Sequence, residues 1–280
     1  MIMNKTRIWL IAGLSLTISG LIICALSFNA LGRDFSRLST VRYETNTYEA
    51  PGTFSSLSIH ADTEDIELLP STDGHTKVVC HEDAKYPHRT QIQSDTLIIN
   101  RPAHPGIRFG VVMDRETISV YLPAATYDKL VIDSDTGDVE IPADFSFMEL
   151  QIDLDTGDLD CLAGVNGLLQ VTSDTGGIDL ADLKAGDLRL TTTTGDVRLT
   201  NVISAGSMQI ETDTGDVRFD GSDAMTITVR TDTGDVTGTL RSAKTFVTNT
   251  DTGAVDVPQA GNGGNCEIRT DTGDIRISIQ

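Results

Sequence analysis

The sequence has few basic residues, and that shortage excludes one class of function. Lysine and arginine together number 21 among 280 residues, against 41 aspartates and glutamates. The first 33 residues hold three of the basic side chains and no acid, which leaves 18 basic against 41 acidic side chains in the remainder. A surface with that balance repels nucleic acids and anionic lipids. Binding of polyanions by simple electrostatics is therefore excluded.

Aromatic residues and histidine are also scarce, and they are unevenly placed. No tryptophan, tyrosine or histidine occurs from residue 129 onward. The second half therefore lacks the usual platform for stacking sugar rings. All five histidines lie earlier, and their spacing suggests no set of metal ligands, so we expect solvated loop side chains. They are His60, His75, His81, His88 and His104.

The phrase Asp-Thr-Gly-Asp, or a close variant, occurs eight times between residues 133 and 276. Its glycines follow one another at intervals of 19 or 20 residues. A fixed period of this size is typical of a solenoid, in which each repeat is one coil stacked on the last. We expect glycine at each turn because it reaches positive φ at little cost. The eight turn glycines are Gly137, Gly157, Gly176, Gly195, Gly215, Gly234, Gly253 and Gly273.

Apolar residues alternate on both sides of each turn. In the second repeat Leu150 and Ile152 precede Gly157, while Leu159 and Cys161 follow it, and the same positions are mostly aliphatic in the other repeats. Alternation of this kind predicts two short strands per coil, each with one buried face. The predicted fold is all-β, a right-handed parallel β-helix of about 19–20 residues per coil. The same parity places the threonine before each glycine inward and the flanking aspartates outward.

The cysteines are too few and too far apart to staple the fold. Cys161 and Cys266 fall at inward positions several coils apart, beyond the reach of a disulfide. We expect buried free thiols.

The amino-terminal segment predicts one transmembrane helix. No charge lies between Arg7 and Arg33, and a span of that length crosses a bilayer. The predicted parts are a cytoplasmic tail (1–7), the transmembrane helix (8–32) and a stalk (33–50), with the solenoid outside the cytoplasm. A cleaved signal peptide is the alternative, with cleavage near Ala25-Leu26-Ser27.

Residues 51–128 show strand signals without the regular phrase, whereas 129–280 hold the regular repeats. The segment Ala61-Asp62-Thr63-Glu64-Asp65 resembles a degenerate turn, with Glu64 in the place of glycine. Terminal repeats of solenoids are usually atypical because they cap the stack. We therefore predict irregular first coils and a cap within one domain.

The apolar anchor, the stalk with Arg33-Asp34-Phe35-Ser36 and the repeated Thr-Asp-Thr-Gly-Asp phrase together resemble the bacterial putative-adhesin family. Its LiaG-like members sit in the envelope of Gram-positive bacteria. The resemblance implies a membrane-anchored β-solenoid in the cell envelope and an interaction or stress-accessory role. It implies no catalytic residue and no cofactor. A protein or envelope polymer is the partner that it suggests.

Asp-Thr-Gly is also the catalytic phrase of aspartic proteases. Those enzymes need two aspartates that share a proton in a hydrophobic setting. Here the phrase recurs in every coil at an outward corner, where turn chemistry explains it. The sequence therefore predicts no enzyme of this kind, and a polysaccharide-active β-helix enzyme is the alternative that its many carboxylates leave open.

Two rows of outward aspartates flank the corner. We expect them to accept hydrogen bonds from backbone amides of their own turns. The alternative is a calcium-binding ladder, since carboxylates of neighbouring coils could share a hard cation. Its candidate ligands are Asp135, Asp138, Asp155, Asp158, Asp213, Asp216, Asp232, Asp235, Asp271 and Asp274.

The carboxyl-terminal repeat ends at Gln280 and still follows the phrase. An uncapped final coil leaves strand edges unpaired. We therefore predict self-association, or strand addition by a partner, through the coil that contains Ile275 and Ile277.

Overall fold

The computed structural model describes residues 5–30, 32–33, 41–102, 114–259 and 261–280. Most of the predicted tail and residues 34–40 of the predicted stalk lie outside these residues. The chain separates into two compact units, Met1–Tyr43 with Pro105–Arg115, and Glu44–His104 with Glu116–Gln280.

The first unit contains one apolar helix, α1, which spans Lys5–Ala30. Its segment Gly13–Ala30 has a mean hydropathy of 1.7, and none of it is buried in the protein. The helix ends where Gly32 adopts a φ of 72° and donates its N–H to the carbonyl of Asn29. The helix is long and apolar enough to cross a membrane, a property that signal sequences share.

The second unit is built almost entirely of strands. The irregular part holds β1 (Tyr43–Glu49), β2 (Ser56–Ala61), β3 (Asp65–Pro70), β4 (Lys77–Asp83), β5 (Arg89–Gln93), β6 (Thr96–Asn100) and β7 (Thr117–Leu122). The regular part opens with β8 (Thr126–Thr136), β9 (Val139–Ile141), β10 (Ser146–Thr156), β11 (Leu159–Cys161), β12 (Gly164–Thr175), β13 (Ile178–Ala181), β14 (Lys184–Thr194) and β15 (Val197–Thr200). It continues with β16 (Ile203–Thr214), β17 (Val217–Thr233), β18 (Val236–Leu240), β19 (Thr245–Thr252), β20 (Val255–Asp256), β21 (Asn265–Thr272) and β22 (Ile275–Ile279).

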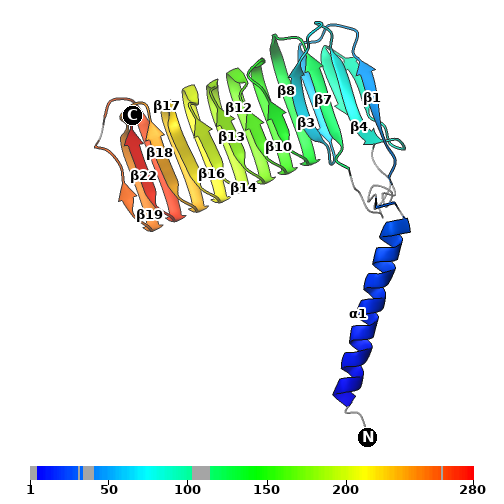
Figure 1. Ribbon diagram of the computed structural model, residues 1–280. Helices are drawn as coiled ribbons and strands as arrows, with labels where there is room; N and C mark the ends of the chain where they lie inside the picture. The colour runs from blue at the N-terminus through cyan, green and yellow to red at the C-terminus, as the bar shows by residue number, and fades with distance from the viewer. Residues whose placement is uncertain (1–4, 31, 34–40, 103–113, 260) are drawn as a thin grey trace. The chain divides into compact units, whose positions relative to one another are not determined.

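Each regular coil has two strands, as predicted, but the strand before the glycine is long and only the strand after it is short. The long strands form one parallel sheet and the short strands a second, and the coils follow one another along the stack in Figure 1. The register places Leu150 beside Leu169 and Leu159 beside Ile178. The aliphatic columns are buried in all regular coils except that of Gly253. The protein is therefore a β-solenoid with a filled interior.

The order of the coils departs from the order of the sequence at the carboxyl end. Strand β21 pairs with β17 on one side and with β19 on the other. Strand β22 likewise lies between β18 and β20. The last coil of the sequence is therefore inserted one position inward, and the coil of β19 and β20 forms the end of the stack. Figure 1 shows β19 at this end.

This order corrects the prediction that the carboxyl-terminal coil is an open edge. Ile275 is buried and Ile277 is 5% exposed, because the neighbouring coils cover them on both sides. Lys244, which is 1% exposed, stabilises this insertion of the last coil. Its ammonium donates to the carbonyls of Ala224 and Gly263 and pairs with Asp223. The half-exposed inward side chains belong to the coil of β19 instead.

The amino-terminal end uses the same kind of insertion, followed by a cap. Strand β2 lies between β6 and β8, and β3 lies between β7 and β9. Antiparallel strands then close the stack, since β5 pairs with β6 and β4 pairs with β7. Strand β1 adds to β4, so part of the predicted stalk is a strand of this cap. Its residues were not predicted because Tyr43–Glu49 is polar and largely exposed.

Candidate functional site

The repeated corner requires glycine because the neighbouring coil approaches it closely. A Cβ atom on Gly176 would lie 1.9 Å from the carbonyl oxygen of Gly157, and one on Gly215 would lie 2.0 Å from that of Gly195. Gly176 also has a φ of +146°, which side-chain-bearing residues rarely adopt. The glycines stack in one column, and Glu64 precedes Gly137 in it, as the degenerate turn predicted.

The threonines before the glycines point to solvent, which corrects the prediction that they face inward. Thr156, Thr214 and the equivalent residues are exposed in all eight coils. The pleat already changes at the preceding aspartate, so aspartate and threonine are both outward. The inward polar position lies two residues earlier, where Thr212 and Thr231 are buried.

The aspartates after the glycines form a ladder between coils. Asp138 accepts the backbone N–H of Asp158 at 3.0 Å, and Asp158 accepts that of Gly177 at 2.7 Å. The same contact recurs from Asp196 to the end of the stack. The backbone N–H groups of Asp216, Asp235, Asp274 and Ala254 donate to the carboxylates of Asp196, Asp216, Asp235 and Asp274, respectively. We predicted that each aspartate accepts a backbone amide of its own turn, whereas in the structure the amide belongs to the neighbouring coil.

The aspartates two residues before the glycines form a second, freer row. Asp135, Asp155, Asp213, Asp232 and Asp271 are exposed, and no hydrogen-bond donor among the described residues reaches their carboxylates. Burial and the charge of Asp155 raise the pKa of Asp135. Repulsion along this row is therefore not relieved by the protein itself.

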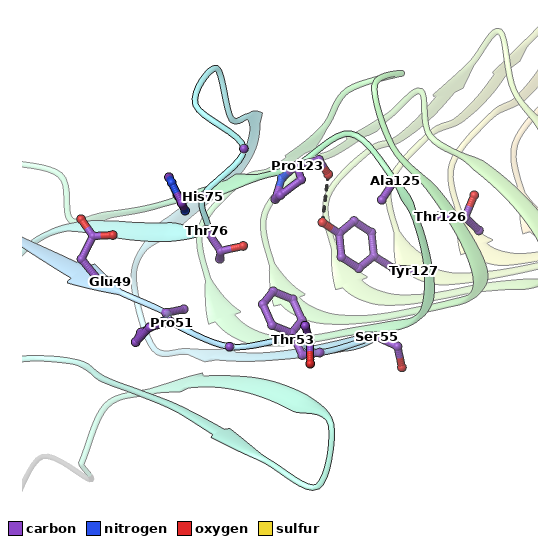
Figure 2. Close-up of a pocket in the computed structure, with 14 residues that line it drawn as sticks. Glu49, Pro51, Thr53, Ser55, His75, Thr76, Pro123, Ala125, Thr126 and Tyr127 are labelled. Carbon is purple, nitrogen blue, oxygen red and sulfur yellow. Dashed lines mark hydrogen bonds between the residues drawn. The ribbon is translucent and has the colours of Figure 1, made fainter.

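A cleft of about 460 Å³ lies at the junction of the cap and the stack. It is formed by the segments that connect β1 to β2, β3 to β4 and β7 to β8, with Glu49, His75 and Tyr127 among its lining residues (Figure 2). The ring of Tyr127 stacks on Phe54 at 6.1 Å, and its hydroxyl donates to the carbonyl of Pro123. The rings of Phe54 and Tyr127 thus line the cleft, but Tyr127 is only 6% exposed.

A buried ion network joins the cap to the first coils. Glu64, Glu82 and Glu116 are at most 3% exposed. The guanidinium of Arg101 contacts Glu64 at 2.7 Å and Glu116 at 2.6 Å. The imidazole of His88 lies between Glu82, which it contacts through Nδ1, and Glu64, at 3.4 Å from Nε2. Two cations therefore hold three carboxylates inside the protein.

The charges in this network are stabilised by their partners. Burial alone would lower the pKa of His88, but hydrogen bonds that the protonated ring donates to Cys80, Glu64 and Glu82 raise it to about 11. Burial would raise the pKa of Glu82, but hydrogen bonds from His88, Tyr48 and Asn46 lower it to about 2. His88 is therefore positively charged and Glu82 negatively charged at neutral pH.

Cys80, Glu82 and His88 also satisfy the distances of a metal site, with ligand atoms within 4.8 Å of one another. Both oxygens of Glu82 already accept hydrogen bonds, from Tyr48, Asn46 and the backbone and ring of His88. Burial raises the pKa of the Cys80 thiol, so the thiolate that a metal needs is disfavoured. We interpret the group as a clamp that holds the cap.

The structure separates the predicted site residues into two groups. It brings the aspartates of each row into neighbouring coils, and it leaves Asp251-Thr252-Gly253 exposed at the end of the stack, without the hydrophobic setting of a protease dyad. Cys161 and Cys266 are buried free thiols, as predicted. Sequence reasoning treated His88 as a solvated loop residue. Its partner Glu82 lies six residues before it and Glu64 lies further away, and the polar Glu64 at a glycine position was the one signal in the sequence.

Similar structures share this fold at low sequence identity. A putative adhesin from Bacteroides fragilis is 15% identical, with a TM-score of 0.55 over 85% of this chain and 97% of its own. A putative lipid binding protein from Parabacteroides distasonis is 12% identical, with a TM-score of 0.54 over 86% of this chain and 98% of its own. No curated protein matches the chain.

The family model that matches is the Toastrack DUF4097 model, and it covers residues 54–280. That range begins just before β2 and includes the inserted coils at both ends of the solenoid. The chain belongs to the Toastrack DUF4097 family.

Proposed function

We propose that the chain is a membrane-anchored adhesin or interaction protein of the cell envelope, with its solenoid outside the cytoplasm. One observation carries the proposal: exposed aspartate and threonine columns stay in register over the regular coils, while the interior is filled. A repetitive face of this kind suits an extended partner, such as an envelope polymer or a protein. The resemblance to LiaG-like members and the name of the adhesin from Bacteroides fragilis support the same role.

The structure indicates which row can be altered without harming the fold. Asp155, Asp174 and Asp213 belong to the row before the glycines, and no described donor depends on them. Changing all three to Asn removes charge and keeps the shape. We expect proximity labelling in intact cells to lose partner capture for the triple variant, whereas Asp174→Asn alone retains it. Unchanged capture by the triple variant would show that this face is not used.

Anchoring is a separate part of the proposal. Helix α1 is apolar along Gly13–Ala30, and we expect it to stay on the mature protein. Mass spectrometry of the protein from membranes tests this directly. A mature amino terminus after Ala25 would show that the segment is a cleaved signal peptide instead.

A calcium ladder along the same aspartates is the alternative explanation of the two rows. The row before the glycines has unrelieved repulsion, which a hard cation would reduce. The row after the glycines is occupied by amides of the next coil. We expect millimolar calcium to raise the melting temperature only slightly. A shift of several degrees that disappears in the Asp213→Asn, Asp232→Asn, Asp251→Asn variant would establish the ladder.

A polysaccharide-active enzyme is the competing class. The hollow that such an enzyme would use lies beside Gly177, measures about 410 Å³ and is lined by Asp158, Asp160, Asp179 and Asp196. Burial and the charge of Asp179 raise the pKa of Asp160, as for a general acid. The described residues that line the hollow include no aromatic ring to hold a sugar. Polysaccharide cleavage that is lost on Asp160→Asn would support the enzyme.

A further inference from the structure

The two ends of the solenoid are treated differently by this chain. At the amino-terminal end, β5 and β4 pair with the outermost strands and cover their edges. At the other end, β19 pairs with β21 and β20 pairs with β22, both on the inner side. Among the described residues no strand covers the outer edge. The parallel pairing of strands therefore ends at the coil of β19 and β20, and the outer edge of this coil is open.

This open coil also exposes part of the core. Its inward residues Phe246, Thr248 and Thr250 are only half-buried, although the same positions are buried in the interior coils. The inward Val255 is 46% exposed, and Val247 on the outward face is 58% exposed. Thr248 takes a place that is aliphatic in the other coils, which reduces the apolar surface at the end but does not remove it.

Although Asp256 and Pro258 follow in the same coil, strand β19 itself lacks the features with which natural proteins block strand addition. These are lysine, proline, bulges and covering segments. Strand β19 reads Thr-Phe-Val-Thr-Asn-Thr-Asp-Thr, and Asp251 is its only charge. Threonine, valine and phenylalanine all favour strands. The column of aspartates after the glycines also ends here, because Ala254 replaces the aspartate. In β19 and β20 only Asp251 and Asp256 are charged, so this edge carries little charge for a strongly acidic protein.

A second copy of the same chain fits this edge by symmetry. A two-fold axis in the plane of the end face, perpendicular to the strands, lays β19 antiparallel to its copy and β20 antiparallel to its copy. Both sheets then continue across the interface, and the half-buried inward side chains of the two end coils cover one another. Near the midpoint of β19 the facing residues are uncharged, so the arrangement does not bring carboxylates together.

We propose that two copies of this chain associate end to end through β19 and β20. The proposal goes beyond the adhesin-like role, because it uses a different surface and does not depend on the aspartate rows. It moves the predicted self-association from the carboxyl-terminal coil to the coil that the structure places at the end. A second copy is favoured over an unrelated partner since the same edge, turned by the two-fold, supplies the complementary strand.

Cross-linking of the full chain in its native membrane tests the geometry. Asn249 lies beside the midpoint of β19, so Asn249→Cys places two thiols near the axis. Cys24 is exposed and is replaced by Ser, whereas Cys80, Cys161 and Cys266 are buried and stay. Arg230→Cys is the matched control, because Arg230 occupies the same column on the interior strand β17. We expect a short bismaleimide to give a dimer-sized adduct for Asn249→Cys and none above background for Arg230→Cys.

A second measurement addresses the edge itself. In detergent-solubilised full chain, Val247→Lys with Asn249→Lys places like charges across the axis, and we expect dissociation at roughly tenfold higher concentration than wild type. The control is Thr228→Lys, which lies in the column of Val247 beside the native Arg230 and leaves association unchanged. Equal thermal melting of the two variants shows that folding is intact. A monomeric wild type at all concentrations, or an Asn249→Cys adduct with another protein or within one chain, would overturn the proposal.

Discussion

The close contact at the glycine column makes one substitution pair especially informative. A Cβ on Gly176 would lie 1.9 Å from the oxygen and 2.6 Å from the carbon of the Gly157 carbonyl, where ordinary contacts begin at 3.4 Å. Both atoms belong to the backbone of the next coil and cannot rotate away. The neighbouring Gly177 has room, since its nearest atoms would be 3.5 and 3.8 Å from a Cβ. Two adjacent glycines therefore predict opposite results.

Gly176→Ala must push two coils apart by more than an ångström. The movement strains the hydrogen bonds from Gly157 to the Thr175 carbonyl and from Gly176 to the Thr194 carbonyl, both 3.0 Å long. Backbone strain at positive φ and overpacking each cost about 1–3 kcal/mol, so we expect a loss of about 3 kcal/mol. For a unit of this size that lowers the melting temperature by roughly 6–12 °C.

Gly177→Ala is the control for the loss of glycine as such. It creates no close contact and restricts the unfolded chain, so we expect a gain of about 0.4–1 kcal/mol. Thermal unfolding followed by circular dichroism measures both variants in the full chain. If Gly176→Ala and Gly177→Ala have the same melting temperature, the coils do not approach each other this closely, and the glycine column needs another explanation.

Three further predictions follow from the contacts. Because the pKa of Glu82 is lowered from 4.5 to about 2, its stabilising effect is complete above pH 4.5 and is lost as the pH falls toward 2; hydrogen exchange of β4 should accelerate in that window, and Glu82→Gln should remove the pH dependence. Lys244→Met leaves the partly buried Asp223 without its cation and should cost about 3 kcal/mol, seen as faster exchange in β19 to β22 but not in β8 to β12. Gly177→Asp fills the gap in the inter-coil ladder opposite the amide of Asp196, and a melting temperature below that of Gly177→Asn would show that charge repulsion outweighs the new hydrogen bond.

The aspartate rows show which features the alternation in the sequence can predict and which it cannot. Their outward direction follows from period-2 alternation, and the structure agrees. The alternation also placed Thr156 and its equivalents inward, which is wrong because the pleat changes two residues before the glycine. The acceptor role of Asp158 was expected within its own turn. Which coil supplies the amide depends on the spacing between coils, and a single repeat carries no information about that spacing.

The sequence by itself determined the coil. The period of 19–20 residues, the glycine at each corner and the aliphatic columns fix two strands per repeat and a β-solenoid, because no other arrangement buries those columns. Only the tertiary structure decided the order of the coils at both ends. Every coil presents the same edges and the same register, so local patterns allow either neighbour, and the choice rests on distant contacts such as those of Lys244 with Asp223 and of His88 with Glu64.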